Sequence, residues 1–331
     1  MVGIGLYLPV YGGWLPGKGS AKAAESGISF DWEGEHPPTY QYVKQVALKA
    51  EEMGVDSLWI PDHLLNPIKG ERAPSMEAWT LATALAEATN RVAIAHTTLC
   101  EAFRYPAVLA KQGAALWDIS EGRFILSLGA GWFKREYEAY GLTYLSHEHR
   151  IVRAKEAMLI IRMLWEQDEV NFKGRFYSIE KGVLEPKPSP RPPLWYAGMS
   201  PHSRDLVAEV AEGWLMAGGT LEDVERNVED MLERLERKGR RRIEFAVPGL
   251  AFIRSTDGEA ERHVEKLTGG DRRVLDRTLD TGLVGSPVTV AQKVRALAEK
   301  GANHVLFQLT PTLEELDGLS EVLSLLRKDG V

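Results

Sequence analysis

Strand-like and helix-like segments alternate along this 331-residue chain, and this alternation limits the possible fold more than any other feature. Eight segments have the pattern of buried strands, and helical segments fall between them and after the last one. Alternating strands and helices form parallel sheets, because each helix carries the chain back to the start of the next strand. Eight strands favour one closed (β/α)8 barrel, a TIM barrel, over an open doubly wound sheet.

The expected strands are Gly3–Pro9, Ser57–Pro61, Val92–Thr98, Phe124–Gly129, Leu194–Gly198, Gly213–Ala217, Ile243–Ile253 and His304–Leu309. The expected helices are Tyr40–Met53, Met76–Ala88, Ala107–Ile119, Arg150–Trp165, Ser203–Ala211, Leu221–Lys238, Val288–Lys300 and Thr312–Leu326, with a further short helix after Gly131.

No repeat and no low-complexity linker divides the chain, so we expect a single domain over residues 1–331. Three segments are longer than ordinary connections and are interpreted as insertions: about 11–38, 168–193 and 257–287. The second contains a predicted hairpin, Val170–Phe172 and Phe176–Ile179, and the third is charged and only partly helical. The first and third follow strands, which places them on the face where barrel enzymes carry out chemistry. Long functional loops are often lids, and we expect the third to close over the substrate.

Composition excludes several other classes of protein. The formal net charge of −7 argues against a nucleic-acid-binding surface. Cys100 is the single cysteine, which excludes an internal disulfide and a cysteine-cluster zinc site, and because metal-ligand residues do not cluster we expect no metal. No apolar run approaches the ~20 residues that span a bilayer, and the N-terminus does not have the pattern of a signal peptide. We therefore expect a cytoplasmic protein with no membrane partner.

The segment Phe103–Gly141 is a candidate ligand site. Its apolar run Phe124–Leu128 lies between two glycines, as a strand buried on both faces would. Gly129, Ala130 and Gly131 follow the strand and have little or no side chain, so a flat ligand could lie against the backbone there. In parallel α/β proteins ligands bind at the carboxyl ends of strands, which is where this turn is expected.

Asp62 and His63 end the second expected strand, so their side chains should point into the barrel mouth. A histidine there can act as a base, an acid or a hydrogen-bond donor. The alternative is a helix-capping aspartate beside a loop histidine. Position alone leaves both interpretations open.

Hydroxyl side chains follow two further strands. Thr97 and Thr98 end the third and could bond the polar edge of a ring, although threonines are common there without a function. Ser200 and Ser203 lie three residues apart at an expected helix N-terminus, where they could bind a phosphate. From spacing alone, simple N-capping by serine is the more common outcome.

Three stretches carry a family resemblance: FRYPAVLAKQ from Phe103, SEGRFILSLGAGWFKREYEAYG from Ser120, and KGRFYSIEKGVLEPKPSPRPPLWYAG from Lys173. On these motifs the chain resembles the bacterial luciferase-like family of flavin-dependent monooxygenases and deazaflavin (F420)-dependent oxidoreductases. The resemblance covers nearly the whole chain. It implies a (β/α)8 barrel with insertions, usually a homodimer, that holds the flavin at the carboxyl face of the barrel.

The resemblance also implies roles for individual residues. His63 matches the active-site histidine, with Asp62 beside it, and Thr97 and Thr98 match a cofactor-contacting pair that the family often joins by a non-proline cis peptide. The remaining matches are the turn beneath the isoalloxazine ring (Gly129, Ala130 and Gly131) and the phosphate cradle (Gly198, Met199, Ser200 and Ser203). Met199 stands where many relatives have a glycine.

The hypothesis is a two-component monooxygenase that uses reduced FMN from a separate flavin reductase, together with O2, to oxidise a small organic substrate. One alternative is direct hydride transfer with F420, and another is a non-catalytic flavin-binding barrel. Trp132 stands where sugar-phosphate dehydrogenases of the F420 branch have an acidic residue, which disfavours that substrate. Ala246–Leu250 lacks the arginine and histidine thought to hold substrate in alkanesulfonate monooxygenases, which disfavours a sulfonate.

Overall fold

A closed barrel of parallel strands forms the centre of the protein in the computed structural model, which describes residues 2–30 and 38–328. Neighbouring strands pair in chain order, and the last barrel strand pairs back to the first, for example Ile4 with Val305. This closure confirms the predicted TIM barrel. The barrel strands are β1 (Gly3–Tyr7), β2 (Ser57–Ile60), β3 (Ala93–His96), β5 (Phe124–Gly129), β8 (Leu194–Ala197), β9 (Gly213–Leu215), β10 (Glu244–Ile253) and β12 (His304–Leu309).

Each barrel strand lies within a predicted strand or begins and ends close to it, and β5 and β12 agree at both ends. β2 and β9 are buried at every residue, as expected of strands that face the barrel interior on one side and helices on the other. The two-residue strand β4 (Leu99–Cys100) extends the pairing beside β5 and leads into the 3-10 turn η1 (Glu101–Phe103).

Helices surround the barrel, and most begin at a side chain that caps the first turn. Each helix expected from the sequence is present, and the observed ranges are α2 (Tyr40–Met53), α3 (Ala78–Ala88), α4 (Pro106–Ile119), α5 (Lys134–Ala139), α6 (His147–Glu166), α7 (Pro201–Val210), α8 (Leu221–Arg237), α11 (Pro287–Glu299) and α12 (Thr312–Lys328). Helix α6 begins earlier than predicted, because the Ser146 hydroxyl accepts a hydrogen bond from the His149 amide at 3.3 Å. No helix in the described part of the chain is long and apolar enough to cross a membrane.

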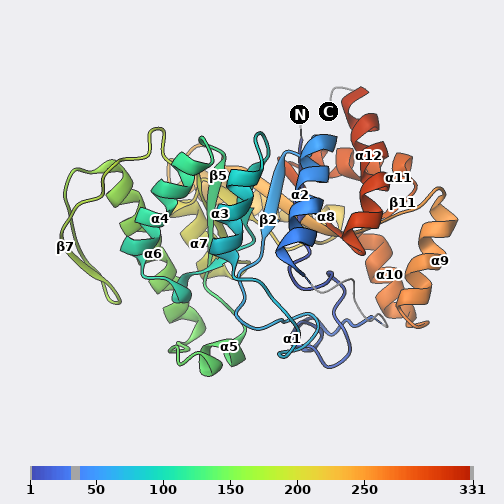
Figure 1. Cartoon of the computed structure of the whole chain (residues 1–331), viewed down its shortest axis with the longest axis horizontal. Coiled ribbons are helices and arrows are strands. Elements are labelled where there is room, and N and C mark those ends of the chain that lie inside the picture. The colour runs from blue at the N-terminus through green and yellow to red at the C-terminus, as the bar shows by residue number, and fades with distance from the viewer. Residues whose placement is uncertain (1, 31–37, 329–331) are drawn as a thin grey trace.

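The insertions lie outside the barrel strands. The second contains the predicted antiparallel hairpin, β6 (Val170–Lys173) and β7 (Ser178–Gly182), which projects at the left of Figure 1. The third is more helical than predicted: α9 (Asp257–Leu267) and α10 (Arg272–Thr281) precede β11 (Leu283–Gly285), which pairs with β10.

The first insertion contains α1 (Ala21–Ser26), and its predicted range includes residues 31–37, which lie outside the described residues. Leu15 and Phe30 of this insertion pack into one apolar cluster with Val264, Val274 and Leu275 of the third. The two insertions therefore build one wall together. Figure 1 shows α1 and α5 at the same end of the barrel.

Candidate functional site

A cavity of about 670 Å³ opens at the carboxyl ends of the barrel strands. Its wall includes residues from the ends of β1, β5, β8 and β9 and residues from the first and third insertions. Every residue predicted as catalytic or cofactor-binding borders it: Asp62, His63, Thr97, Thr98, Gly129, Ala130, Gly131, Gly198, Met199, Ser200 and Ser203.

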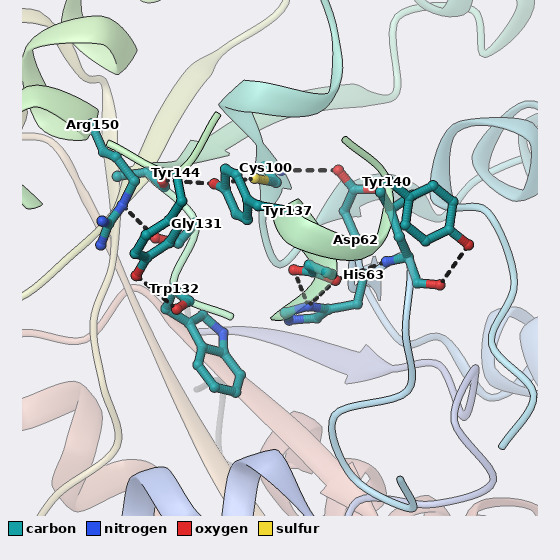
Figure 2. Close-up of polar contacts among 12 residues, drawn as sticks. Asp62, His63, Cys100, Gly131, Trp132, Tyr137, Tyr140, Tyr144 and Arg150 are labelled. Carbon is teal, nitrogen blue, oxygen red and sulfur yellow. Dashed lines mark hydrogen bonds and ion pairs between the residues drawn. The ribbon is translucent and has the colours of Figure 1, made fainter. Parts of the chain in front are cut away.

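His63 is held by a buried carboxylate that sequence reasoning missed. The His63 Nδ1 lies 2.9 Å and 3.1 Å from the two carboxylate oxygens of Glu136, whose side chain is 1% exposed. Glu136 Oε2 also accepts the Leu64 amide at 2.9 Å. Because an ionised carboxylate only accepts hydrogen bonds, Nδ1 carries the proton and Nε2 is the atom able to take one from a ligand. Figure 2 shows this contact beside the Trp132 ring.

Asp62 is fully engaged by protein groups. Its two oxygens accept the Arg104 guanidinium at 2.6 Å and 3.1 Å, and Oδ2 also accepts the Cys100 amide at 2.9 Å. This buried, bidentate ion pair fixes the chain that follows β3. This geometry suits a residue that holds the site in position. It does not suit a residue that transfers a proton.

The chain between β3 and β4 has the implied non-proline cis peptide, Thr97–Thr98. The Thr97 hydroxyl donates to the Tyr7 hydroxyl at 2.7 Å. A Cβ at Gly129 would contact Thr98 Oγ1 at less than van der Waals distance, so a larger residue there would displace a hydroxyl from the cavity wall. Gly129 is thus packed against Thr98, and both residues border the cavity.

Gly131 has a left-handed backbone, with φ of 72°. A Cβ there would overlap the Tyr137 hydroxyl and the Cys100 sulfur, so both conformation and packing require glycine. The Cys100 sulfur lies 3.0 Å from the Tyr137 oxygen, and burial raises the pKa of the thiol to about 12. At neutral pH Cys100 is therefore a protonated thiol and a poor nucleophile.

Ser200 and Ser203 meet at the N-terminus of α7. Ser200 is the N-cap residue and accepts the Ser203 amide at 3.2 Å, and its hydroxyl donates to the Ser203 hydroxyl at 3.0 Å. The expected N-cap is confirmed, and the capping pair also borders the cavity. Met199 Sδ accepts the Ala217 amide at 3.3 Å, so this side chain lies toward the end of β9. His147 lies in the first turn of α6 and borders the same cavity.

Comparison with known proteins identifies the family. The family model for luciferase-like monooxygenases matches residues 14–277. The chain belongs to this family. An F420-dependent glucose-6-phosphate dehydrogenase of Amycolatopsis mediterranei (strain U-32) is 30% identical over 292 residues, which are 80% of this chain and 86% of the relative. An FMNH2-dependent dimethylsulfone monooxygenase of Pseudomonas fluorescens (strain Pf0-1) is 26% identical over 257 residues, 67% of this chain and 70% of the relative.

A solved structure of an F420-dependent secondary alcohol dehydrogenase in complex with an F420-acetone adduct has the same fold, with a TM-score of 0.77 at 21% identity. The match covers 98% of this chain and 99% of that one. The luciferase-like protein described here is thus a flavin- or F420-dependent oxidoreductase. The comparisons are consistent with either cofactor.

The luciferase-like site depends on several residues that sequence reasoning did not single out. Arg104 pairs with Asp62, and Arg150 donates from Nε to the Gly131 carbonyl at 3.1 Å while its guanidinium lies 4.2 Å from the centre of the Tyr144 ring. Figure 2 shows Arg150 on the far side of Gly131 from His63. One signal for Glu136 was available, since it is an acidic residue in the first turn of the helix that follows the glycine turn.

Aromatic side chains of β1 and of the first insertion form the wall beside His63. Ring centroids lie 5.1 Å apart for Tyr7 and Trp14, 5.7 Å for Tyr11 and Trp14, and 6.1 Å for Tyr11 and His63. Burial, with the charges of Asp62 and Glu136, raises the pKa of Tyr11 well above its usual range, so its phenol stays protonated. Within residues 2–30 and 38–328, Tyr11 Oη and Trp14 Nε1 are buried without a hydrogen-bond partner.

The described residues contain no group of three or more histidine, cysteine, aspartate or glutamate side chains able to hold a metal ion.

Proposed function

We propose that the cavity holds reduced FMN and that the protein is a two-component monooxygenase, which oxidises a small organic substrate with dioxygen. The observation that carries the proposal is that all the residues matched to flavin contacts border one cavity, together with the His63–Glu136 pair. The family name and the FMNH2-dependent relative support the same cofactor.

The residues present fit such a cofactor. Gly129, Ala130 and Gly131 border the cavity with no side chain larger than a methyl group, which would suit one face of a ring system, and Thr97 and Thr98 would contribute hydroxyls at its edge. Gly198, Met199, Ser200 and Ser203 would surround the phosphate, because the α7 N-terminus and two hydroxyls favour an anion. The buried polar atoms of Tyr11 and Trp14 offer hydrogen bonds that no described residue uses.

Reduced FMN, when bound, supplies the electrons that activate dioxygen. His63 would accept or return a proton at Nε2, while Glu136 holds Nδ1 in one tautomer. Asp62 would keep the β3–β4 connection in place through Arg104 and the Cys100 amide. The buried aromatic wall would limit the access of water to the reacting centre, which protects reactive intermediates from hydrolysis.

The reduced cofactor would come from a separate flavin reductase, so this chain needs no nicotinamide site of its own. Its relative from Pseudomonas fluorescens is named as FMNH2-dependent, which supports delivery of the cofactor in the reduced state.

F420-dependent hydride transfer is the second candidate, because the relative at 30% identity is F420-dependent. In that case the deazaflavin ring would occupy the same surface and His63 Nε2 would exchange a proton with the hydroxyl or carbonyl of the substrate. No oxygen would be consumed.

Titration of the protein under anaerobic conditions with reduced FMN and with F420 tests the proposal. We expect reduced FMN to bind more tightly, and Ser203→Ala to weaken FMN binding while it leaves riboflavin, which has no phosphate, unaffected. Tight F420 binding with no affinity for FMN would refute the first candidate and support the second. A His63→Ala variant that turns over as fast as the wild type would remove the histidine from the mechanism.

A further inference from the structure

The side of the cavity opposite the glycine turn is apolar. β12 and β10 are the eighth and seventh barrel strands and lie across the barrel from β5 and β3, which lead to the proposed ring surface. Residues from the ends of β9 and β10 and from the first and third insertions line this side: Trp14, Ile28, Phe30, Leu215, Met216, Pro248, Gly249, Leu250 and Gly282. The part of this surface that β9, β10 and the residues directly after them supply has no hydrogen-bonding side chain.

Charges along the cavity are compensated. Asp62 is paired with Arg104, Glu136 with His63, and Lys22 with Glu25 on α1. Among the described lysine and arginine residues that border the cavity, this leaves Arg277 as the uncompensated charge. Arg277 is exposed on α10. A substrate carboxylate, sulfonate or phosphate buried against the β10 and β12 side would lose its hydration without gaining a cation, which is costly.

Gln308 is the hydrogen-bonding side chain that the barrel strands contribute to this side. The Thr278 and Thr281 hydroxyls of α10 also border the cavity but donate to carbonyls of their own helix, and Trp14 contributes its indole N–H. Gln308 lies on β12 in register with Leu250, is partly buried, and borders the cavity. Within the described part of the chain its side-chain amide makes no hydrogen bond. An amide offers both a donor and an acceptor, so it can pair with a carbonyl, a hydroxyl or another neutral polar group.

We infer that this compartment takes a neutral, largely apolar substrate with one polar group, and that Gln308 recognises that group. The inference deepens the proposed function and rests on it for the position of the ring surface. A hydrogen bond in an apolar pocket selects strongly against molecules that leave the protein group unpaired. Gln308 is then a specificity-determining residue.

Calorimetric binding of 2-octanone, octanoate and 1-octanesulfonate to the full chain, with and without FMN, tests the inference. We expect 2-octanone to bind and both anions to bind more weakly. Gln308→Leu, which keeps the side-chain volume, should weaken 2-octanone binding about fivefold, the loss of one neutral hydrogen bond. Gln45→Leu, a matched change at an exposed position on α2, should have no effect.

Two results would overturn the inference: tighter binding of octanesulfonate than of 2-octanone, with that affinity lost in Arg277→Ala, or a Gln308→Leu variant that loses FMN binding and keeps its 2-octanone affinity. If 2-octanone binds neither to the FMN-loaded protein nor to the FMN-free protein, the inference is also overturned. The proposed function fails separately, because a protein that binds 2-octanone selectively but binds no FMN supports the apolar compartment and contradicts the cofactor.

Discussion

Replacing Glu136 with glutamine tests the buried contact that holds His63. The carboxylate of Glu136 accepts from the His63 Nδ1 and from the Leu64 amide and is 1% exposed. A glutamine of the same shape has one acceptor oxygen and one amide donor. If the oxygen keeps the Leu64 bond, the amide must face Nδ1 as a donor. The stable tautomer of His63 would then carry its proton on Nε2.

The cost follows from the bonds exchanged. One charge-assisted hydrogen bond, worth about 1.5–3 kcal/mol, is replaced by a neutral one worth about 1 kcal/mol, so the free energy of unfolding should fall by about 0.5–2 kcal/mol. Loss of a correctly protonated acid–base group should lower turnover about 10²–10⁴-fold. Glu138→Gln on the same helix is the matched control, because Glu138 is exposed and pairs with Lys134 at the surface. Its effect on stability should be under about 1 kcal/mol.

Nitrogen-15 correlation spectra of the imidazole report the His63 tautomer directly, and urea unfolding reports the stability of both variants. We expect the wild type to be protonated at Nδ1 and Glu136→Gln at Nε2. If the variant keeps the wild-type tautomer and turnover, Glu136 does not position His63 and the reasoning is wrong.

Three further outcomes are expected. Gly141→Ala, at a left-handed φ of 68°, should cost about 1–2 kcal/mol of stability from backbone strain. Gly131→Ala, at φ of 72°, should cost more, because its Cβ would also overlap the Tyr137 hydroxyl and the Cys100 sulfur. Gly131→Ala should lose cofactor affinity as well, since only there would the Cβ meet other atoms; equal cofactor affinity in the two variants would contradict this. Burial lowers the pKa of His96 from 6.5 to about 3. The unfolded chain thus binds more protons between those values, and the stability present above pH 6.5 is lost as the pH falls. At pH 5 the wild type should have lost about 2 kcal/mol of unfolding free energy that a His96→Phe variant keeps. If urea unfolding shows the same pH dependence of stability in both proteins, this prediction is wrong. Cys100 should resist iodoacetamide at pH 8 in the native state and react in urea, and rapid native alkylation would contradict its burial.

The barrel was predictable because its signals are local. A buried strand and the helix after it each have a periodic pattern within a few residues, and β5 and β12 could be placed to the residue. β11 was missed because its three residues lie inside the segment 257–287, which was interpreted as a charged insertion. The helical character of α9 and α10 was underestimated, because they are rich in charged residues and bury few apolar ones.

The candidate site was predictable in part for the same reason. His63, the glycine turn and the two serines all lie at strand ends or a helix start, where sequence position implies the barrel mouth. The partners of Glu136 and Arg104 were not predictable, because they are distant in sequence: His63 lies 73 residues from Glu136, and Asp62 lies 42 residues from Arg104. Such contacts exist only once the barrel is closed.

A crystal structure of the protein with reduced FMN tests the central claim most directly. We predict that the isoalloxazine ring lies against Gly129–Gly131 beside Thr97 and Thr98, with the phosphate within hydrogen-bond distance of the Ser200 and Ser203 hydroxyls. A ring bound elsewhere, or a phosphate that contacts neither serine, would contradict the account.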